Sequence, residues 1–366
     1  MKLEYIFAAF AILGALDKMT GNRLKLGGEF EKGIMTVGVL VMSMSGTLVL
    51  APVLGKALGA VFSPLAELMN IDVAVAASFI ANDSGGAVMA YEMSEDPQMR
   101  AYHGLVVASM FGATVCPVVP LALQIVDKRF HEDVLTGLLC GIATIPVGCL
   151  IGGLVMKIPF CPLLRNTVPM ILIAGIICLG LWKAPDLTRK IFGGFGKFLS
   201  ALILAGLALG ILEQLTGLCP IPGTAPLSES FVVIGNIAVI LAGAFPMLAI
   251  LSRLFGKGFR KLGGAMGISE TSVLGFVTTL ANSVPMMSMM EKMDKKGRVL
   301  NMAFAVSAGF VFGDHLAFTL AFDGQYALPV TLGKLAGAVA ALGLASFLYG
   351  RTAEQKFDAV QESNGR

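Results

Sequence analysis

Three short polar motifs interrupt apolar stretches of this sequence, and each carries groups that could bind a small polar molecule. They are NDSGG at 82–86, NSVP at 282–285 and GDH at 313–315. A carboxylate inside an apolar segment costs at least a few kcal/mol on membrane-insertion scales, roughly 2.5–3.5 at the helix centre, so it is expected only where it has a partner or a function. The motifs are therefore the first candidates for a site.

Asp83 is the acid of the first motif, and it follows Asn82 directly. Gly85 and Gly86 allow the backbone to leave a helix, which frees carbonyl and amide groups to line a cavity. An unpaired carboxylate beside unwound backbone predicts a site for a small cation. The alternative is that Asp83 only caps the second half of a broken helix, and the two roles are compatible. We assign Asn82 and Asp83 to substrate binding and the two glycines to a hinge.

The second motif is uncharged. Asn282 offers a donor and an acceptor, Ser283 offers a hydroxyl, and Pro285 ends the helical hydrogen-bond ladder and would open the next half-helix. The alternative is a simple kink satisfied by neighbouring helices. If this break meets the one at Asp83, the two breaks would form one binding site from two halves.

The third motif places Asp314 next to His315, with Gly313 as a further hinge. Such a pair is costly in an apolar run unless its members are paired with each other or with a ligand. Histidine titrates near neutral pH, so the pair could bind or relay a proton. The alternative is a static ion pair that locks this segment to its neighbours.

The composition shows what surrounds these motifs. Of the 366 residues, 56% are apolar and only 14% are charged, with a mean hydropathy of +0.80. A soluble chain carries about 25% charged residues, so this composition predicts an all-α polytopic membrane protein. No basic tract is dense enough to suggest nucleic acid as a partner. The lipid bilayer is the expected partner, and a homo-oligomer is left open.

Eleven hydrophobic segments can be drawn between charges, Gly and Pro, at about 3–20, 33–55, 72–92, 101–125, 132–156, 167–183, 197–217, 229–255, 267–291, 299–322 and 328–350.

Two pairs of short matches run through these segments in the same order. LGALDKMTG at 13–21 is echoed by LGILEQLTG at 209–217, and IAND at 80–83 by LANS at 280–283. Segments one to five thus repeat as seven to eleven. We expect a first repeat at 1–160, a connector with one helix at 161–195, a second repeat at 196–350 and a cytoplasmic tail at 351–366.

The distribution of Lys and Arg favours a particular topology. If segments three and nine dip into the membrane and return, 21 of the 27 Lys and Arg share one face, against six on the other. The six are Lys2, Lys56, Arg100, Lys157, Arg165 and Lys334. By the positive-inside rule the N-terminus is then outside, the C-terminus is cytoplasmic and the two repeats are inverted. Kinked, spanning helices are the alternative for segments three and nine.

The sequence lacks the common catalytic motifs. GxxxxGK followed by Ser or Thr, GxSxG, HExxH and clustered Cys/His ligands do not occur. We therefore expect neither an enzyme nor a cofactor or metal site.

A set of longer motifs resembles one family. These motifs are GGEFEKG at 27–33, LAPVL at 50–54, NDSGG at 82–86, FPM at 245–247, LANSVPM at 280–286, KMD at 292–294, FAVSA at 304–308 and FGDH at 312–315. Over residues 27–322 the chain resembles the EutH family of bacterial ethanolamine permeases. It departs from the family form at Asn82, where a Cys is usual, and at Ser283, where a second Asn is usual.

The resemblance implies a protein of the bacterial cytoplasmic membrane that admits ethanolamine, a small cation at neutral pH. We expect alternating access about a midplane site, with Asp83 pairing with the substrate ammonium. Asp314 and His315 are expected close by, either completing the binding site or coupling transport to protons. Uniport and proton- or Na⁺-coupled symport remain open, as do a different small polar substrate and a membrane-embedded amine sensor that moves nothing.

Overall fold

The computed structural model describes residues 3–364, and all the regular structure in that range is helical. Seven of the described helical segments are long and apolar enough to cross a bilayer. They are Gly27–Met69, Pro97–Ile125, Lys128–Val155, Phe160–Lys183, Pro185–Thr216, Leu227–Leu254 and Asp314–Tyr349. The predicted all-α polytopic membrane protein is confirmed.

The first half of the chain alternates long helices with short irregular ones. Its elements are α1 (Leu3–Met19), α2 (Gly27–Met69), η1 (Val73–Phe79), η2 (Asn82–Gly86), α3 (Ala87–Met93), α4 (Pro97–Ala101), η3 (Tyr102–Gly112), η4 (Thr114–Val118), α5 (Val119–Ile125), η5 (Lys128–Phe130) and α6 (His131–Val155).

One connecting helix, α7 (Phe160–Lys183), leads to the second half. That half contains α8 (Pro185–Thr216), α9 (Leu227–Met266), α10 (Glu270–Ala281), α11 (Ser283–Met289), η6 (Met290–Lys292), α12 (Lys295–Ala308), α13 (Asp314–Asp323), η7 (Gly324–Tyr326) and α14 (Ala327–Asn364).

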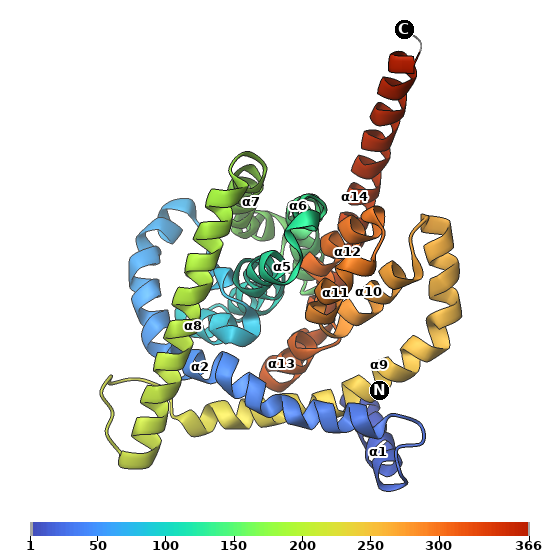
Figure 1. Cartoon of the computed structure of the whole chain (residues 1–366). Coiled ribbons are helices and arrows are strands. Elements are labelled where there is room, and N and C mark those ends of the chain that lie inside the picture. The colour runs from blue at the N-terminus through green and yellow to red at the C-terminus, as the bar shows by residue number, and fades with distance from the viewer. Residues whose placement is uncertain (1–2, 365–366) are drawn as a thin grey trace.

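The two longest helices, α2 and α9, lie side by side and change direction at opposite ends of their shared stretch (Figure 1). Each contains proline inside the helix, Pro52 and Pro64 in α2 and Pro246 in α9, which removes backbone hydrogen bonds and permits a bend. The short helix α1 packs on α9, whereas α8 packs on α2. The first helix of each half therefore contacts the second helix of the other half.

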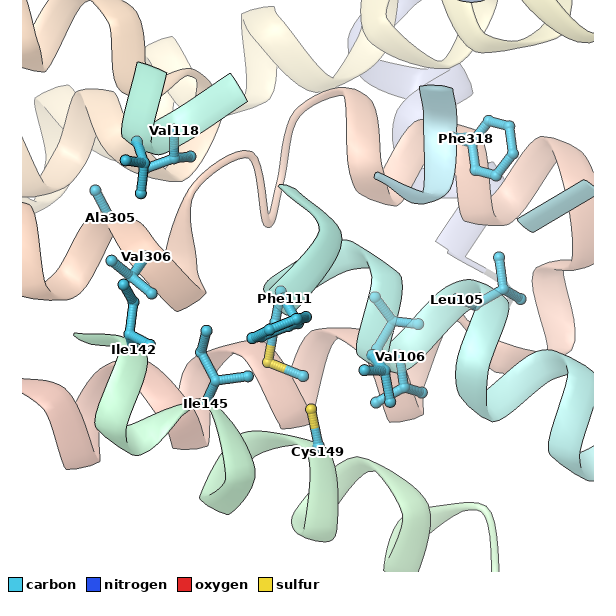
Figure 2. Close-up of a cluster of buried hydrophobic side chains, with 14 of the residues drawn as sticks. Leu105, Val106, Phe111, Val118, Ile142, Ile145, Cys149, Ala305, Val306 and Phe318 are labelled. Atoms are coloured by element: carbon cyan, nitrogen blue, oxygen red, sulfur yellow. The ribbon is translucent and has the colours of Figure 1, made fainter. Parts of the chain in front are cut away.

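The core lies where α6, η3 and α12 meet. Figure 2 shows Ile142, Ile145 and Cys149 of α6 facing Phe111 and neighbouring apolar side chains of the η3 segment, all of them fully buried. Segments far apart in the sequence thus share one apolar core, which holds the interrupted segments beside it.

Three segments are interrupted in their middle. The third breaks around η2, the ninth breaks at Asn282 between α10 and α11, and the tenth leaves the helix at residues 309–313 between α12 and α13. In the last of these, Phe310 has a φ of +61°, which is uncommon for a residue with a side chain. These breaks lie where the sequence placed its three polar motifs.

Candidate functional site

The first break is a single irregular turn at 82–86. Gly85 has a φ of +108°, a conformation that L side chains rarely adopt, and a Cβ there would lie 2.7 Å from the Thr47 Cβ of α2. Ser84 is also non-helical, with φ −88° and ψ 22°. The turn therefore needs glycine for its backbone shape and its close contact with α2, and it leaves Asp83 half-buried between two helical pieces.

The η3 segment crosses this break at very short range. A Cβ on Gly112 would lie 2.2 Å from the carbonyl oxygen of Ile80, and one on Gly86 would lie 2.3 Å from the same atom. Backbone therefore meets backbone here, and only glycine fits at either position.

The second and third motifs cross in a similar way. A Cβ on Gly313 would lie 2.0 Å from the carbonyl oxygen of Ala281. The Phe310 and Phe312 N–H groups donate to the Thr279 and Leu280 carbonyls at 3.1 and 2.8 Å. Backbone groups freed by the break of one segment are satisfied by the end of the other, as unwound backbone at membrane depth requires.

The two crossings bring three of the predicted residues together. One possible ligand atom from each of Asp83, Asp314 and His315 lies within 4.8 Å of the other two. The carboxylates are half-buried, and His315 is 2% exposed. This group is compact enough to surround one small cation, and it joins the third segment to the tenth.

Lys334 of α14 completes this group, and the sequence analysis missed it. Its Nζ donates to the Ser109 carbonyl at 2.6 Å and lies 3.1 Å from Nδ1 of His315, and the side chain is 1% exposed. Lys334 therefore places a positively charged ammonium group directly beside His315.

Counting Lys334 among the charges of one membrane face was wrong, because α14 begins at Ala327 and the lysine lies well inside it. The sequence did carry a signal. Gly333 and Gly337 flank the lysine, and α14 approaches α6 so closely that a Cβ on Gly333 would lie 2.8 Å from the Gly148 carbonyl. Small residues four apart are typical of tightly packed membrane helices, so this face of α14 points into the protein.

Several buried polar atoms around the breaks have no hydrogen-bond partner among the described residues. Both polar side-chain atoms of Asn82 are in this state, as are the hydroxyls of Ser283, Thr279 and Ser307. Buried polar groups are nearly always paired, so unpaired ones mark places where a ligand or water is expected. Asn82 and Ser283 were both predicted as site residues, one on each break.

Asn282 and Pro285 have a different role. The Asn282 Oδ1 accepts the Val284 N–H at 2.8 Å and caps α11, and the side chain is exposed. Pro285 lies in the first turn of α11, where no helical N–H is required. These two residues define the start of α11.

A cavity of about 1050 Å³ leads to the first break. Its walls come from α2, α5 and α8, and Ser84 lies in its lining beside Asp83. The lining is mostly apolar, with Gln124 and Lys197 among its few polar members. Of the two carboxylates, Asp83 is therefore the one whose neighbour in sequence contacts open space.

A separate polar network joins α10 to α12 outside the spanning segments. Asp294 accepts hydrogen bonds from the Ser269 N–H at 2.7 Å, the Ser272 hydroxyl at 2.7 Å and the Gly297 N–H at 2.9 Å. Burial raises the pKa of Asp294, but these hydrogen bonds outweigh it and lower the pKa to about 2. The acid thus fixes the ends of the two segments that cross at Gly313.

Comparison with known proteins identifies the chain's relatives. The family model of the ethanolamine utilisation protein EutH matches residues 2–348. The chain belongs to the EutH family. Three relatives carry the name "Probable ethanolamine permease EutH": those of Listeria monocytogenes (42% identical, covering 95% of this chain and 93% of the relative), Escherichia coli (38%, 94% and 94%) and Salmonella typhimurium (36%, 99% and 98%). No solved structure matches the chain.

This membership accords with the resemblance noted in the sequence. It establishes a multi-pass membrane protein of a family named for permeases rather than enzymes.

Proposed function

We propose that the protein carries ethanolamine across the bacterial cytoplasmic membrane by alternating access. The observation that carries this proposal is the meeting of Asp83 with Asp314 and His315 at the crossing of interrupted helices inside an apolar protein. Interrupted helices that form a central polar site are typical of secondary transporters. The choice of ethanolamine as the substrate is supported by the names of the relatives, which are called probable ethanolamine permeases.

In this proposal Asp83 holds the ammonium of ethanolamine. A charge-assisted pair of this kind, taken out of water, is worth a few kcal/mol, roughly twice a neutral hydrogen bond. Asn82 and Ser283, whose buried polar atoms have no partner among the described residues, would bind the substrate hydroxyl and remaining N–H groups, with Asn282 at the rim. Gly85, Gly86 and Gly313 would permit the two crossings to change shape.

The proposal also includes the membrane topology of the chain. The two halves, 1–160 and 196–350, would be inverted repeats with the N-terminus outside and residues 351–366 in the cytoplasm. The exchange of partners between α1, α2, α8 and α9 supports this, because a two-fold axis in the membrane would generate it. With Lys334 removed from the loops, the Lys and Arg count becomes 21 against five, so the charge argument is unchanged.

Counterflow in proteoliposomes tests the function. Vesicles loaded with unlabelled ethanolamine should take up labelled ethanolamine faster than protein-free vesicles, and faster than vesicles loaded with an unrelated solute. A sensor that only binds the amine would give no exchange, and that outcome would overturn the proposal.

A further inference from the structure

Lys334 is the one lysine or arginine that is fully buried among the described side chains, and nothing in the proposed binding of ethanolamine uses it. Its ammonium is held by two contacts, the Ser109 carbonyl at 2.6 Å and His315 Nδ1 at 3.1 Å. Burying a lone cation in a membrane protein is costly, so a buried lysine of this kind is expected to have negative charge nearby. The acids of this group are Asp314 and Asp83, which cluster with His315, the histidine that Lys334 contacts.

Lys334 and His315 together carry one positive charge. A protonated lysine has only donors, so Nδ1 of His315 must accept and the imidazole is then neutral. If the shared proton moved to the ring, the lysine would be neutral and the sum would be the same. The two carboxylates contribute two negative charges, so the whole group has a net charge of minus one.

Other titratable groups near the site do not alter this sum. Cys116 lies near Asp83 and Cys149 near Lys334, and both are thiols buried away from any base that would ionise them. His103, the titratable histidine of η3, faces Ser78 at 3.0 Å and Asn166 at 3.3 Å instead. The single negative charge therefore belongs to the carboxylate pair.

We propose that Lys334 is the permanent counter-ion of Asp314, and that the one remaining negative charge, at Asp83, is neutralised alternately by the substrate ammonium and by a proton. The proposal rests on the proposed function, since it takes ethanolamine as the cation at Asp83. The exchange is balanced: the protonated site plus ethanolammonium gives the loaded site plus a released proton.

This charge balance determines what can cross the membrane. Both the protonated and the loaded site are neutral, whereas the empty site keeps an unpaired charge that is costly at the bilayer centre. Only the two neutral forms should change access readily. The protein would therefore exchange one ethanolammonium for one proton and move no net charge. Neither uniport of the cation nor proton symport would follow from this arrangement.

The response to membrane potential is the decisive test. Purified protein in potassium-loaded vesicles is given labelled ethanolamine at equal pH on both sides, with valinomycin setting the potential, and protein-free vesicles give the background. A cation moving alone would accumulate about 50-fold at −100 mV, since 100 mV is worth about 2.3 kcal/mol per charge. We expect a ratio near one at every potential, and about tenfold accumulation when the lumen is one pH unit more acidic. Accumulation that follows the potential would overturn the exchange.

Charge-balanced variants test the role of Lys334 itself. Lys334→Met leaves two uncompensated acids, and we expect net uptake to fall at least tenfold. Adding Asp314→Asn restores the single negative charge, and uptake should return to within about threefold of wild type. Lys183→Met, an exposed lysine on α7, is the matched control.

The two variants separate charge from packing. If Lys334 served packing alone, the second substitution would not restore uptake, and this result would overturn its role as counter-ion. The potential measurement uses the wild-type protein and so does not depend on how the variants fold. Wild-type vesicles without counterflow would remove the proposed function and this inference with it. Counterflow with potential-driven accumulation would remove the inference alone.

Discussion

The two regions where segments cross differ in how they combine backbone and charge. At the first crossing, the acid lies on the broken turn itself, and the segment that crosses it contributes Gly112 and neutral neighbours. At the second, the broken turn at Asn282 is uncharged and capped, and the acid and histidine lie on the crossing segment, directly after Gly313. Each crossing therefore supplies one carboxylate. At the first crossing it comes from the broken turn, and at the second it comes from the segment that crosses the break.

This difference indicates that the two crossings do separate work. Both crossings depend on close glycine contacts, but Ser84, next to Asp83, lines the cavity, whereas Asp314 lies with His315 and Lys334. In our account the first crossing receives the substrate and the second balances charge.

Gly313→Ala should disrupt the second crossing most severely. The added Cβ would lie 2.0 Å from a backbone carbonyl that cannot move without breaking the Phe312–Leu280 hydrogen bond. We expect a loss of at least about 3 kcal/mol, the upper range for overpacking, seen as a large fall in Tm or folded yield in detergent. Gly324→Ala, at the other end of α13, is the control because its nearest atom would be 3.8 Å away. Equal Tm values for the two variants would contradict the close contact.

Asp83→Asn should reduce ethanolamine uptake at least tenfold with near-normal expression, because the ammonium loses its charged partner. Labelled uptake in cells with downstream metabolism blocked measures this. Asp186→Asn, an exposed acid paired with Arg189, serves as the control. Full uptake by the Asp83 variant would contradict this role and indicate Asp314 as the partner of the ammonium.

Asn82→Ala and Asn282→Ala sharpen the comparison at equivalent places in the two breaks. The Asn82 side chain has no hydrogen-bond partner among the described residues, so we expect its variant to keep the wild-type Tm but to lose several-fold in apparent affinity for ethanolamine. Asn282 caps α11, so its variant should lose about 1 kcal/mol of stability. The opposite pattern, with Asn82→Ala less stable and fully active, would make Asn82 a structural residue.

Asp294→Asn should have the smallest effect. The folded-state pKa of about 2 lies below the ordinary aspartate pKa of 3.8, so the ionised acid stabilises the fold fully above about pH 4. That contribution is lost as the pH falls through 2. The difference in Tm between wild type and variant, a few degrees at most, should therefore be present at pH 7 and shrink toward pH 3. A Tm difference that grew on acidification would contradict the lowered pKa of Asp294.

Much of the fold could be predicted from the sequence because lipid leaves few choices. Backbone groups at membrane depth must be paired internally, so apolar runs become helices and polar motifs become breaks. The three motifs at Asp83, Asn282 and Asp314 were identified for this reason, and all lie at interruptions in the structure.

The sequence predicted one site shared by Asn82-Asp83 and Asn282-Ser283, with Asp314 and His315 close by, and the structure brings Asp83 together with Asp314 and His315. What the sequence could not predict is the backbone packing that brings them together. Lys334 was missed because a single lysine in an apolar segment reads as a boundary residue unless its glycine neighbours are given weight. Both facts depend on tertiary packing between segments more than 200 residues apart.

Protection of a cysteine at position 84 tests the central claim most directly. In a background with the six native cysteines replaced, Ser84→Cys would react with a thiol reagent through the cavity, and Ser43→Cys on α2 would report a second position in the cavity lining. The account predicts that ethanolamine slows labelling at position 84 several-fold, not at 43, and that Asp83→Asn abolishes the protection. Unchanged labelling at 84 in a variant that still transports would place the substrate elsewhere.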